Sequence, residues 1–313
     1  MKDVLITDRL TKKFNDFIAV DNMSLTVKQG EIFGFLGANG AGKSTAIHMV
    51  TGLLQKTDGE ITIFGKDHKK NRTDIKKEIG LVPQEIAIYE DLTAYENVEF
   101  FAGLYDLRGA NLKEQVMEAL EFVGLSDKKK QYPKTFSGGM KRRLNIACAI
   151  AHRPKLIIMD EPTVGIDPQS RNYILKSVQQ LNENGCTIIY TSHYMEEVEA
   201  ICTRIAIVDN GKIIAEGTKK QLQSLITDSK RILIEVKDPE HVDISAIEHI
   251  RGVTHVQLKE TTLEITTELG SDHLNDLLQY FMDQGIDIRS VDEKEPNLET
   301  VFLTLTGRNL RDA

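Results

Sequence analysis

Residues 37–45 read GANGAGKST, a stretch that fits the pattern G-x-x-x-x-G-K-[ST] at every fixed position. It lies between EIFGFLG (31–37), an apolar run typical of a buried strand, and STAIHMVTGLL (44–54), which favours a helix. Glycines allow successive backbone N–H groups to wrap a phosphate, and the start of a helix adds partial positive charge. The stretch therefore predicts a phosphate-binding loop at the edge of a sheet.

This loop also predicts how a nucleoside triphosphate and its metal ion are held. Lys43 would reach the β- and γ-phosphates, and the Ser44 hydroxyl would bind Mg²⁺. We expect the nucleotide to contact seven residues of the loop: Gly37, Asn39, Gly40, Gly42, Lys43, Ser44 and Thr45.

A second motif, LIIMDEP (156–162), ends an apolar run with Asp160 and Glu161. In an open α/β sheet, ligands bind where the strands end. Asp160 would then hold Mg²⁺, and Glu161 would polarise the attacking water. An isolated pair of acids after a strand is more often a solvated loop. Because a phosphate loop precedes this pair in the same predicted sheet, we favour the catalytic interpretation.

The wider pattern indicates an α/β fold with a smaller module after it. From residue 155 onward, strand-like and helix-like segments alternate, which predicts a mainly parallel sheet with helices on both faces. Residues 92–130 carry apolar positions at spacings of three and four, which indicates helices. Beyond about residue 220, three strand-like segments, a helix, a strand and a closing helix predict an α+β module.

A third segment, FSGGMKRRL (136–144), would by itself be an ordinary helix cap. Together with the two motifs above, Gln84 in GLVPQE and His193 in YTSH, it resembles the ATP-binding cassette (ABC) family over residues 1–218. The resemblance implies a P-loop NTPase with a mixed sheet core and a helical subdomain at about 88–150. It also implies an ATPase, converting ATP and water to ADP and phosphate.

In that family two cassettes pair head to tail, and each ATP lies between one phosphate loop and the partner's signature segment. The resemblance assigns Ser137, Gly138 and Gly139 to that segment, which would offer backbone amides to the γ-phosphate of the other chain. Complete motifs permit a homodimer.

Other site residues are carried over by position. Gln84 resembles the glutamine that approaches Mg²⁺ and the attacking water, His193 the histidine that contacts the γ-phosphate, and Asp167 the aspartate that signals across the dimer. Each has an ordinary alternative: a surface glutamine, a structural histidine and a helix N-cap. Phe14 occupies the place of the ring that stacks on adenine, although the nearby Phe17 competes for it.

The SGGMKRRL form resembles the bacterial subgroup that partners ABC-2-type permeases, which are mainly exporters. Residues 219–313 resemble the accessory domain of that subgroup, with Pro296, Leu298, Glu299 and Phe302 in its closing pattern. We expect this tail either to pack as a plain core or to contact the partner cassette.

Composition limits the alternatives. The net charge of −8 argues against nucleic acid as a partner, and no apolar run reaches the 18 residues of a membrane span. Cys148, Cys186 and Cys202 lack metal-ligand spacing, so we expect reduced thiols in the cytoplasm. The protein would then bind the inner face of the membrane through a permease. A ribosome- or DNA-directed ATPase and a non-hydrolysing regulator remain as alternative functions.

Overall fold

The computed structural model describes residues 2–226, 229–268, 273–294 and 297–307. Contacts divide the described residues into two compact units, one of residues 2–219 and one of residues 220–307.

The first unit is built on a six-stranded sheet. Its strands are β3 (Ile32–Leu36), β6 (Ile79–Val82), β7 (Leu156–Asp160), β8 (Thr187–Ser192), β9 (Arg204–Asp209) and β10 (Lys212–Gly217). Their order is β10-β9-β3-β8-β7-β6, and all pairs are parallel except the β9–β10 hairpin. Because β3, β8 and β7 are neighbours and parallel, the segments that follow them meet at one edge of the sheet.

A second, antiparallel sheet adjoins this core. It is formed, in the order β2-β1-β4-β5, by β1 (Asp3–Phe14), β2 (Phe17–Lys28), β4 (Asp58–Ile63) and β5 (Lys66–Asp67). The turn between β1 and β2 places Asn15 at φ 51°, a conformation that asparagine tolerates. The fold therefore contains parallel and antiparallel strands, which confirms the predicted mixed α/β core.

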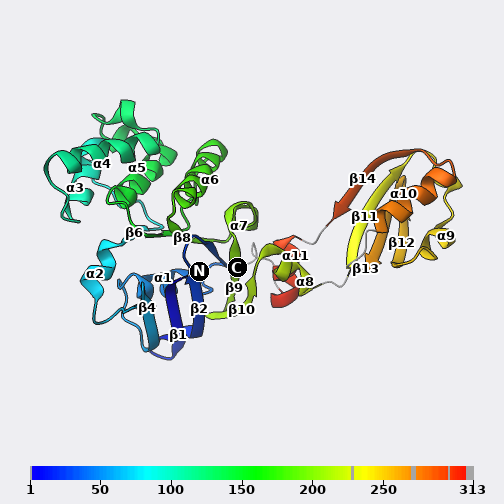
Figure 1. Ribbon diagram of the computed structural model, residues 1–313, viewed down its shortest axis with the longest axis horizontal. Coiled ribbons are helices and arrows are strands. Elements are labelled where there is room, and N and C mark those ends of the chain that lie inside the picture. Colours follow the sequence, from blue (N-terminus) through cyan, green and yellow to red (C-terminus); the bar gives the residue numbers. More distant parts are fainter. Residues whose placement is uncertain (1, 227–228, 269–272, 295–296, 308–313) are drawn as a thin grey trace. The chain divides into compact units, whose positions relative to one another are not determined.

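In the described part of the first unit, seven α-helices follow or separate these strands. They are α1 (Lys43–Val50), α2 (Arg72–Lys77), α3 (Ala94–Gly103), α4 (Gly109–Phe122), α5 (Gly138–Ile150), α6 (Pro168–Glu183) and α7 (Met195–Ile201). Figure 1 shows α3, α4 and α5 grouped away from the strands, between β6 and β7 in the sequence. Short 3-10 helices occupy Ser126–Lys128 and Pro133–Thr135.

The strands of the central sheet bury side chains on both faces. Ile157 and Met159 of β7 belong to the hydrophobic cluster beside α3–α6, whereas Ile158 belongs to the cluster that includes α1 and the antiparallel sheet. Successive residues of a strand point to opposite faces, so a strand covered on both faces is apolar throughout. This explains why LIIM precedes the acidic pair.

The second unit is an antiparallel sheet with helices between its strands. Its elements are α8 (Lys219–Ser224), β11 (Ser229–Val236), a 3-10 turn (Pro239–His241), α9 (Ile244–Glu248), β12 (Val253–Lys259), β13 (Thr262–Glu268), α10 (His273–Asp283), β14 (Ile288–Lys294) and α11 (Leu298–Thr306). The strand order β12-β13-β11-β14 and the βαββαβ sequence define a ferredoxin-like arrangement. Leu298 and Phe302 of α11 are buried, and Pro296 lies outside the described residues.

No helix among the described residues is both long and apolar enough to cross a membrane.

Candidate active site

The phosphate loop leads from β3 into α1 with two glycines in the left-handed region. Gly40 has φ 78° and Gly42, the N-cap of α1, has φ 101°. A Cβ at Gly42 would collide with the carbonyl oxygen of Ala19 on β2. The loop thus has a conformation and a close approach that favour glycine, as a backbone cradle for phosphate requires.

Lys43 is the buried cation of the loop. Its Nζ donates hydrogen bonds to the carbonyl oxygens of Gly37 (2.8 Å) and Ala38 (3.0 Å), and lies 3.2 Å from Glu161 Oε1. Burial lowers the pKa of Lys43, while the Glu161 carboxylate opposes that shift. A phosphate group bound beside Lys43 could take over from the Glu161 carboxylate as the partner of the Lys43 ammonium group.

Asp160 ends β7 and faces the first turn of α1. Its Oδ1 accepts hydrogen bonds from the Ser44 hydroxyl (3.1 Å) and the Thr191 hydroxyl (2.6 Å). Mg²⁺ prefers a few carboxylate and hydroxyl oxygens that leave room for phosphate and water ligands. The oxygen atoms of Ser44 and Asp160 fit that preference.

Glu161 is held in an uncommon backbone conformation, with φ 45°. Its N–H donates to the Thr191 hydroxyl at 2.9 Å, and its Oε2 lies 3.2 Å from His193 Nδ1. Burial raises the pKa of Glu161, but the hydrogen bond with His193 and the charge of Lys43 bring it below the ordinary value. Such strain is typical of functional positions, and the low pKa keeps the carboxylate ionised.

The structure therefore brings together Lys43, Ser44, Asp160, Glu161 and His193, which we call the carboxylate cluster. Three segments that are distant in the sequence contribute to it: the start of α1, the end of β7 with the residue after it, and the segment after β8. Its groups can bind phosphate, bind a divalent cation and position a water molecule.

The signature segment makes its contacts elsewhere. Ser137 is the N-cap of α5 and accepts a hydrogen bond from Met140 N at 3.2 Å. Ser137 and Gly138 are exposed, while Gly139 packs so closely on Ser170 that a Cβ would collide with its hydroxyl. Within one chain, the described contacts thus link this segment to the start of α6 and not to the carboxylate cluster.

Asp167 and Gln84 both adjoin that signature helix. Asp167 caps α6 by accepting from Ser170 N at 2.9 Å, and this bond lowers the pKa of Asp167. Gln84 is exposed, and its backbone carbonyl oxygen accepts a 2.6 Å hydrogen bond from the Arg142 side chain of α5. Arg142 also donates to Pro83 O at 2.7 Å, so a buried guanidinium ties α5 to the segment after β6.

The two candidate adenine-stacking residues lie opposite each other at the turn end of the β1–β2 hairpin. Phe14 pairs with Phe17, and both are exposed. Lys12 Nζ lies 4.7 Å from the centre of the Phe14 ring. Since Ala19 on β2 touches the phosphate loop, both rings lie on a hairpin that passes beside it, and the choice between them stays open.

Sequence reasoning missed three polar residues of this region: Thr191, Arg142 and Glu197. Thr191 bonds both acids of the DE pair, and its place two residues before His193 could have indicated that role. Glu197 shares a helical face with Ile201, four residues on, which marks it as buried. Arg142 gave no local signal, because its partners lie 58 and 59 residues away.

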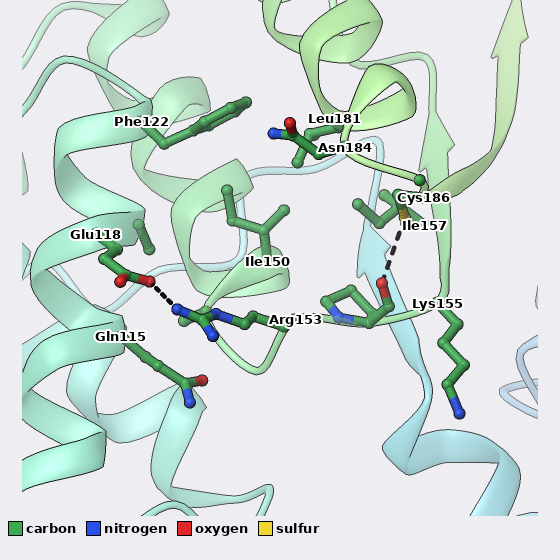
Figure 2. Close-up of a pocket in the computed structure, with 14 residues that line it drawn as sticks. Gln115, Glu118, Phe122, Ile150, Arg153, Lys155, Ile157, Leu181, Asn184 and Cys186 are labelled. Atoms are coloured by element: carbon green, nitrogen blue, oxygen red, sulfur yellow. Dashed lines mark hydrogen bonds and ion pairs between the residues drawn. The ribbon is translucent and has the colours of Figure 1, made fainter. Parts of the chain in front are cut away.

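A cavity of about 420 Å³ lies away from these groups, between α4, the end of α5 and the end of α6. Figure 2 shows Phe122, Ile150 and Ile157 along it and Glu118 paired with Arg153 at one side. The thiol of Cys186 donates to Pro154 O, and burial raises the pKa of that thiol to about 12. The cavity shares no residue with the phosphate loop or the carboxylate cluster.

Comparisons with known proteins agree with this geometry. Residues 20–164 match the ABC transporter family, and residues 217–306 match the DrrA1-3-like ATP-binding protein C-terminal domain. The linearmycin resistance ATP-binding protein LnrL of Bacillus subtilis is 46% identical over 99% of this chain and 100% of its own length. The bacitracin transport ATP-binding protein BcrA of Bacillus licheniformis is 34% identical over 98% of each chain.

A solved dimeric ATP-binding cassette in a post-hydrolysis state, bound to ADP and phosphate, is also similar. It is 28% identical with a TM-score of 0.63, covering 68% of this chain and 98% of that one. The full-length match to relatives, the phosphate loop and the acidic pair lead to one conclusion. This chain belongs to the ABC transporter family and is an ATP-hydrolysing, energy-coupling subunit.

Proposed function

We propose that this chain powers export through a separate membrane permease by hydrolysing ATP between two head-to-tail copies of itself. The carboxylate cluster is the observation that carries this proposal. The phosphate loop and Lys43 bind the triphosphate, Glu161 accepts the proton of the attacking water, and His193 contacts the γ-phosphate.

Mg²⁺ would be held by Ser44 and Asp160, with Gln84 approaching it from the segment after β6. When bound, the ion neutralises phosphate charge in the transition state. Thr191 keeps Asp160 oriented toward Ser44, since its hydroxyl donates to the same carboxylate oxygen.

The signature segment completes the site from a second chain. Ser137 and Gly138 are exposed, and the first amides of a helix such as α5 lack intrahelical acceptors, so they would be available to bind an anion. Phosphate bound there and in the phosphate loop of the other copy would join the two chains, and hydrolysis would loosen them. The dimeric structural relative supports this arrangement.

An exposed aromatic group after Gln84 supports docking on a permease. Tyr89 packs on Phe100 with ring centres 5.1 Å apart, and both are about half exposed. The fully buried Asn97 fixes this group, because it accepts from Tyr89 N at 2.7 Å and donates to Tyr89 O at 2.9 Å. Exposed aromatic side chains on a rigid support are typical of binding surfaces.

The names of the relatives suggest the cargo class. Since LnrL confers linearmycin resistance and BcrA serves bacitracin transport, we propose an antimicrobial compound as cargo and an ABC-2-type permease as partner.

An affinity purification from detergent-solubilised cells tests this function. The Glu161→Gln chain, with ATP present, should recover a polytopic membrane protein detected by mass spectrometry. Added to the Glu161→Gln chain, Tyr89→Ala should lose that protein, whereas Tyr132→Ala, at an exposed tyrosine outside this group, should keep it. Each tyrosine variant with native Glu161 should keep its ATPase activity. Recovery of ribosomal or DNA-binding proteins without a membrane partner would contradict the proposal.

A further inference from the structure

Glu197 of α7 is a buried carboxylate to which the mechanism above gives no role. Only 3% of its surface is exposed. Three hydroxyl groups donate to its Oε2 atom, those of Thr163 at 2.7 Å, Tyr190 at 2.8 Å and Ser192 at 3.3 Å. A buried charge with this many donors is costly to disturb, because removing it leaves several polar groups unpaired.

Two of these donors flank the carboxylate cluster. Thr163 lies two residues after Glu161, on the segment that leads to Asp167. Ser192 directly precedes His193, and its Oγ also accepts a hydrogen bond from Tyr194 N at 2.9 Å. The Ser192 hydroxyl therefore links the residues on both sides of His193. It is itself bonded to Glu197 Oε2, the atom that also holds Thr163.

A second connection runs through Arg171 of α6. Its Nε lies 3.3 Å from Glu197 Oε1, as an ion pair without aligned hydrogen-bond geometry. Its guanidinium covers the Tyr194 ring at 4.9 Å, and the Tyr194 ring lies 4.2 Å from that of His193. The helix that Asp167 caps thus contacts the neighbour of His193 directly.

The geometry points to Glu197 as a positioning residue that holds His193 on Glu161 and transmits movement of the 163–167 segment to His193. This inference rests on the proposed pairing of two cassettes and deepens it. Contact of a second chain with Asp167 would shift Thr163 or α6. That shift would change the hydrogen bonds to Glu197 and the Arg171–Tyr194 contact, which hold the segment carrying His193. The Tyr190 phenol stays a donor throughout, since burial raises its pKa well above the ordinary value.

Glu197→Gln tests the inference, with the exposed neighbour Glu196→Gln as matched control. The amide oxygen still accepts from hydroxyls, but the charge facing Arg171 is lost. We expect kcat for ATP hydrolysis to fall about tenfold, equivalent to about 1.4 kcal/mol, with KM for ATP changed less than about twofold. The control should match the native chain. An unchanged kcat in Glu197→Gln would overturn the inference.

A double-mutant cycle with His193→Ala separates positioning from general stability. If Glu197 acts through His193, Glu197→Gln should lower the single-turnover rate in the native background but not in the His193→Ala background. An equal loss in both backgrounds would overturn the inference. Full activity of His193→Ala alone would instead contradict the role that the proposed function gives that residue.

Arg171→Gln provides a second variant if Glu197→Gln fails to fold. The Arg171 side chain is 31% exposed, so its replacement should leave the fold intact, as a melting curve can verify. We expect kcat to fall about threefold, and again no loss when His193 is alanine. A native kcat, or an equal loss without His193, would contradict the inference.

Discussion

The carboxylate cluster and the signature segment differ in how many of their polar groups find partners within one chain. In the cluster, Lys43, Asp160 and Glu161 are buried and bonded to one another or to neighbours within the chain. In the signature segment, Ser137 and Gly138 are exposed, and the only side-chain cap described there is Ser137 to Met140 N. The first region is built to be complete in one copy, while the second presents its amides outward.

Because of this difference, we expect the two regions to respond differently to mutation. Changes in the carboxylate cluster should act on chemistry within the chain and on its stability. Changes in the signature segment should act on what a second chain can complete, with little effect on the fold.

The largest effect is expected for Glu161→Gln. Removing the proton acceptor should lower ATP hydrolysis at least about 100-fold, since general base catalysis contributes 10²–10⁴-fold. Nucleotide binding should persist, because Lys43 and the phosphate loop are unchanged. Steady-state hydrolysis and equilibrium ATP binding measure both, with the exposed Glu121→Gln as control. Hydrolysis close to the native rate would exclude Glu161 as the base.

Ser137→Glu should come next. A carboxylate at the exposed start of α5 would repel the γ-phosphate of the other chain, so hydrolysis should fall about 100-fold. Binding of ATP to the single chain should stay near the native value, and loss of the Ser137 cap should lower stability by only about 1 kcal/mol. Ser245→Glu, at an exposed helix start of the second unit, serves as control. A loss of ATP binding in Ser137→Glu would mean that this segment acts within its own chain.

A smaller effect should follow from breaking the connection between α5 and the segment after β6. Arg142→Met leaves the carbonyl oxygens of Pro83 and Gln84 without their guanidinium donor. We expect the chain to lose about 1–3 kcal/mol of stability and hydrolysis to fall about tenfold. Denaturant melts and ATPase assays measure these, and Arg142→Lys should be intermediate. Native behaviour of Arg142→Met would show that the two segments move independently.

The smallest effect concerns the native thiols. Burial raises the pKa of Cys148, Cys186 and Cys202, with Cys186 at about 12. At pH 8 only about one Cys186 thiol in 10⁴ would be ionised, so a thiol-disulfide reagent should react slowly until the chain is denatured. Reactivity should rise as the pH approaches 12. By contrast, the exposed thiol of a Ser137→Cys variant should react at once. Equal reaction rates for that thiol and the native thiols would contradict the proposed difference between the two regions.

How much of the site could be predicted depends on how local its information is. The phosphate loop and the DE pair are short motifs at the ends of strands, so their residues were predicted from the sequence and their chemistry from residue type. Thr191 reaches both acids of the cluster, and Glu197 reaches Thr163 beside it, only because β7 and β8 are adjacent and parallel. No short sequence motif shows that β7 and β8 are neighbours.

The fold shows the same limit. The long strands and helices were predicted from apolar periodicity, whereas α2 and α9 were missed because helices of six and five residues hold too few turns to show it. The antiparallel sheet could be recognised as strands, but its separation from the parallel sheet depends on pairings between distant segments.

The central claim is that ATP binds between the phosphate loop of one copy and the signature segment of another. Asn39→Cys and Ser137→Cys, combined with Glu161→Gln, test it most directly, because both positions are exposed while the native thiols have raised pKa values. With ATP and a mild oxidant, we predict a disulfide-linked dimer on a non-reducing gel, and none without ATP. An ATP-bound chain that forms no such dimer, or a disulfide within a single chain, would contradict the account.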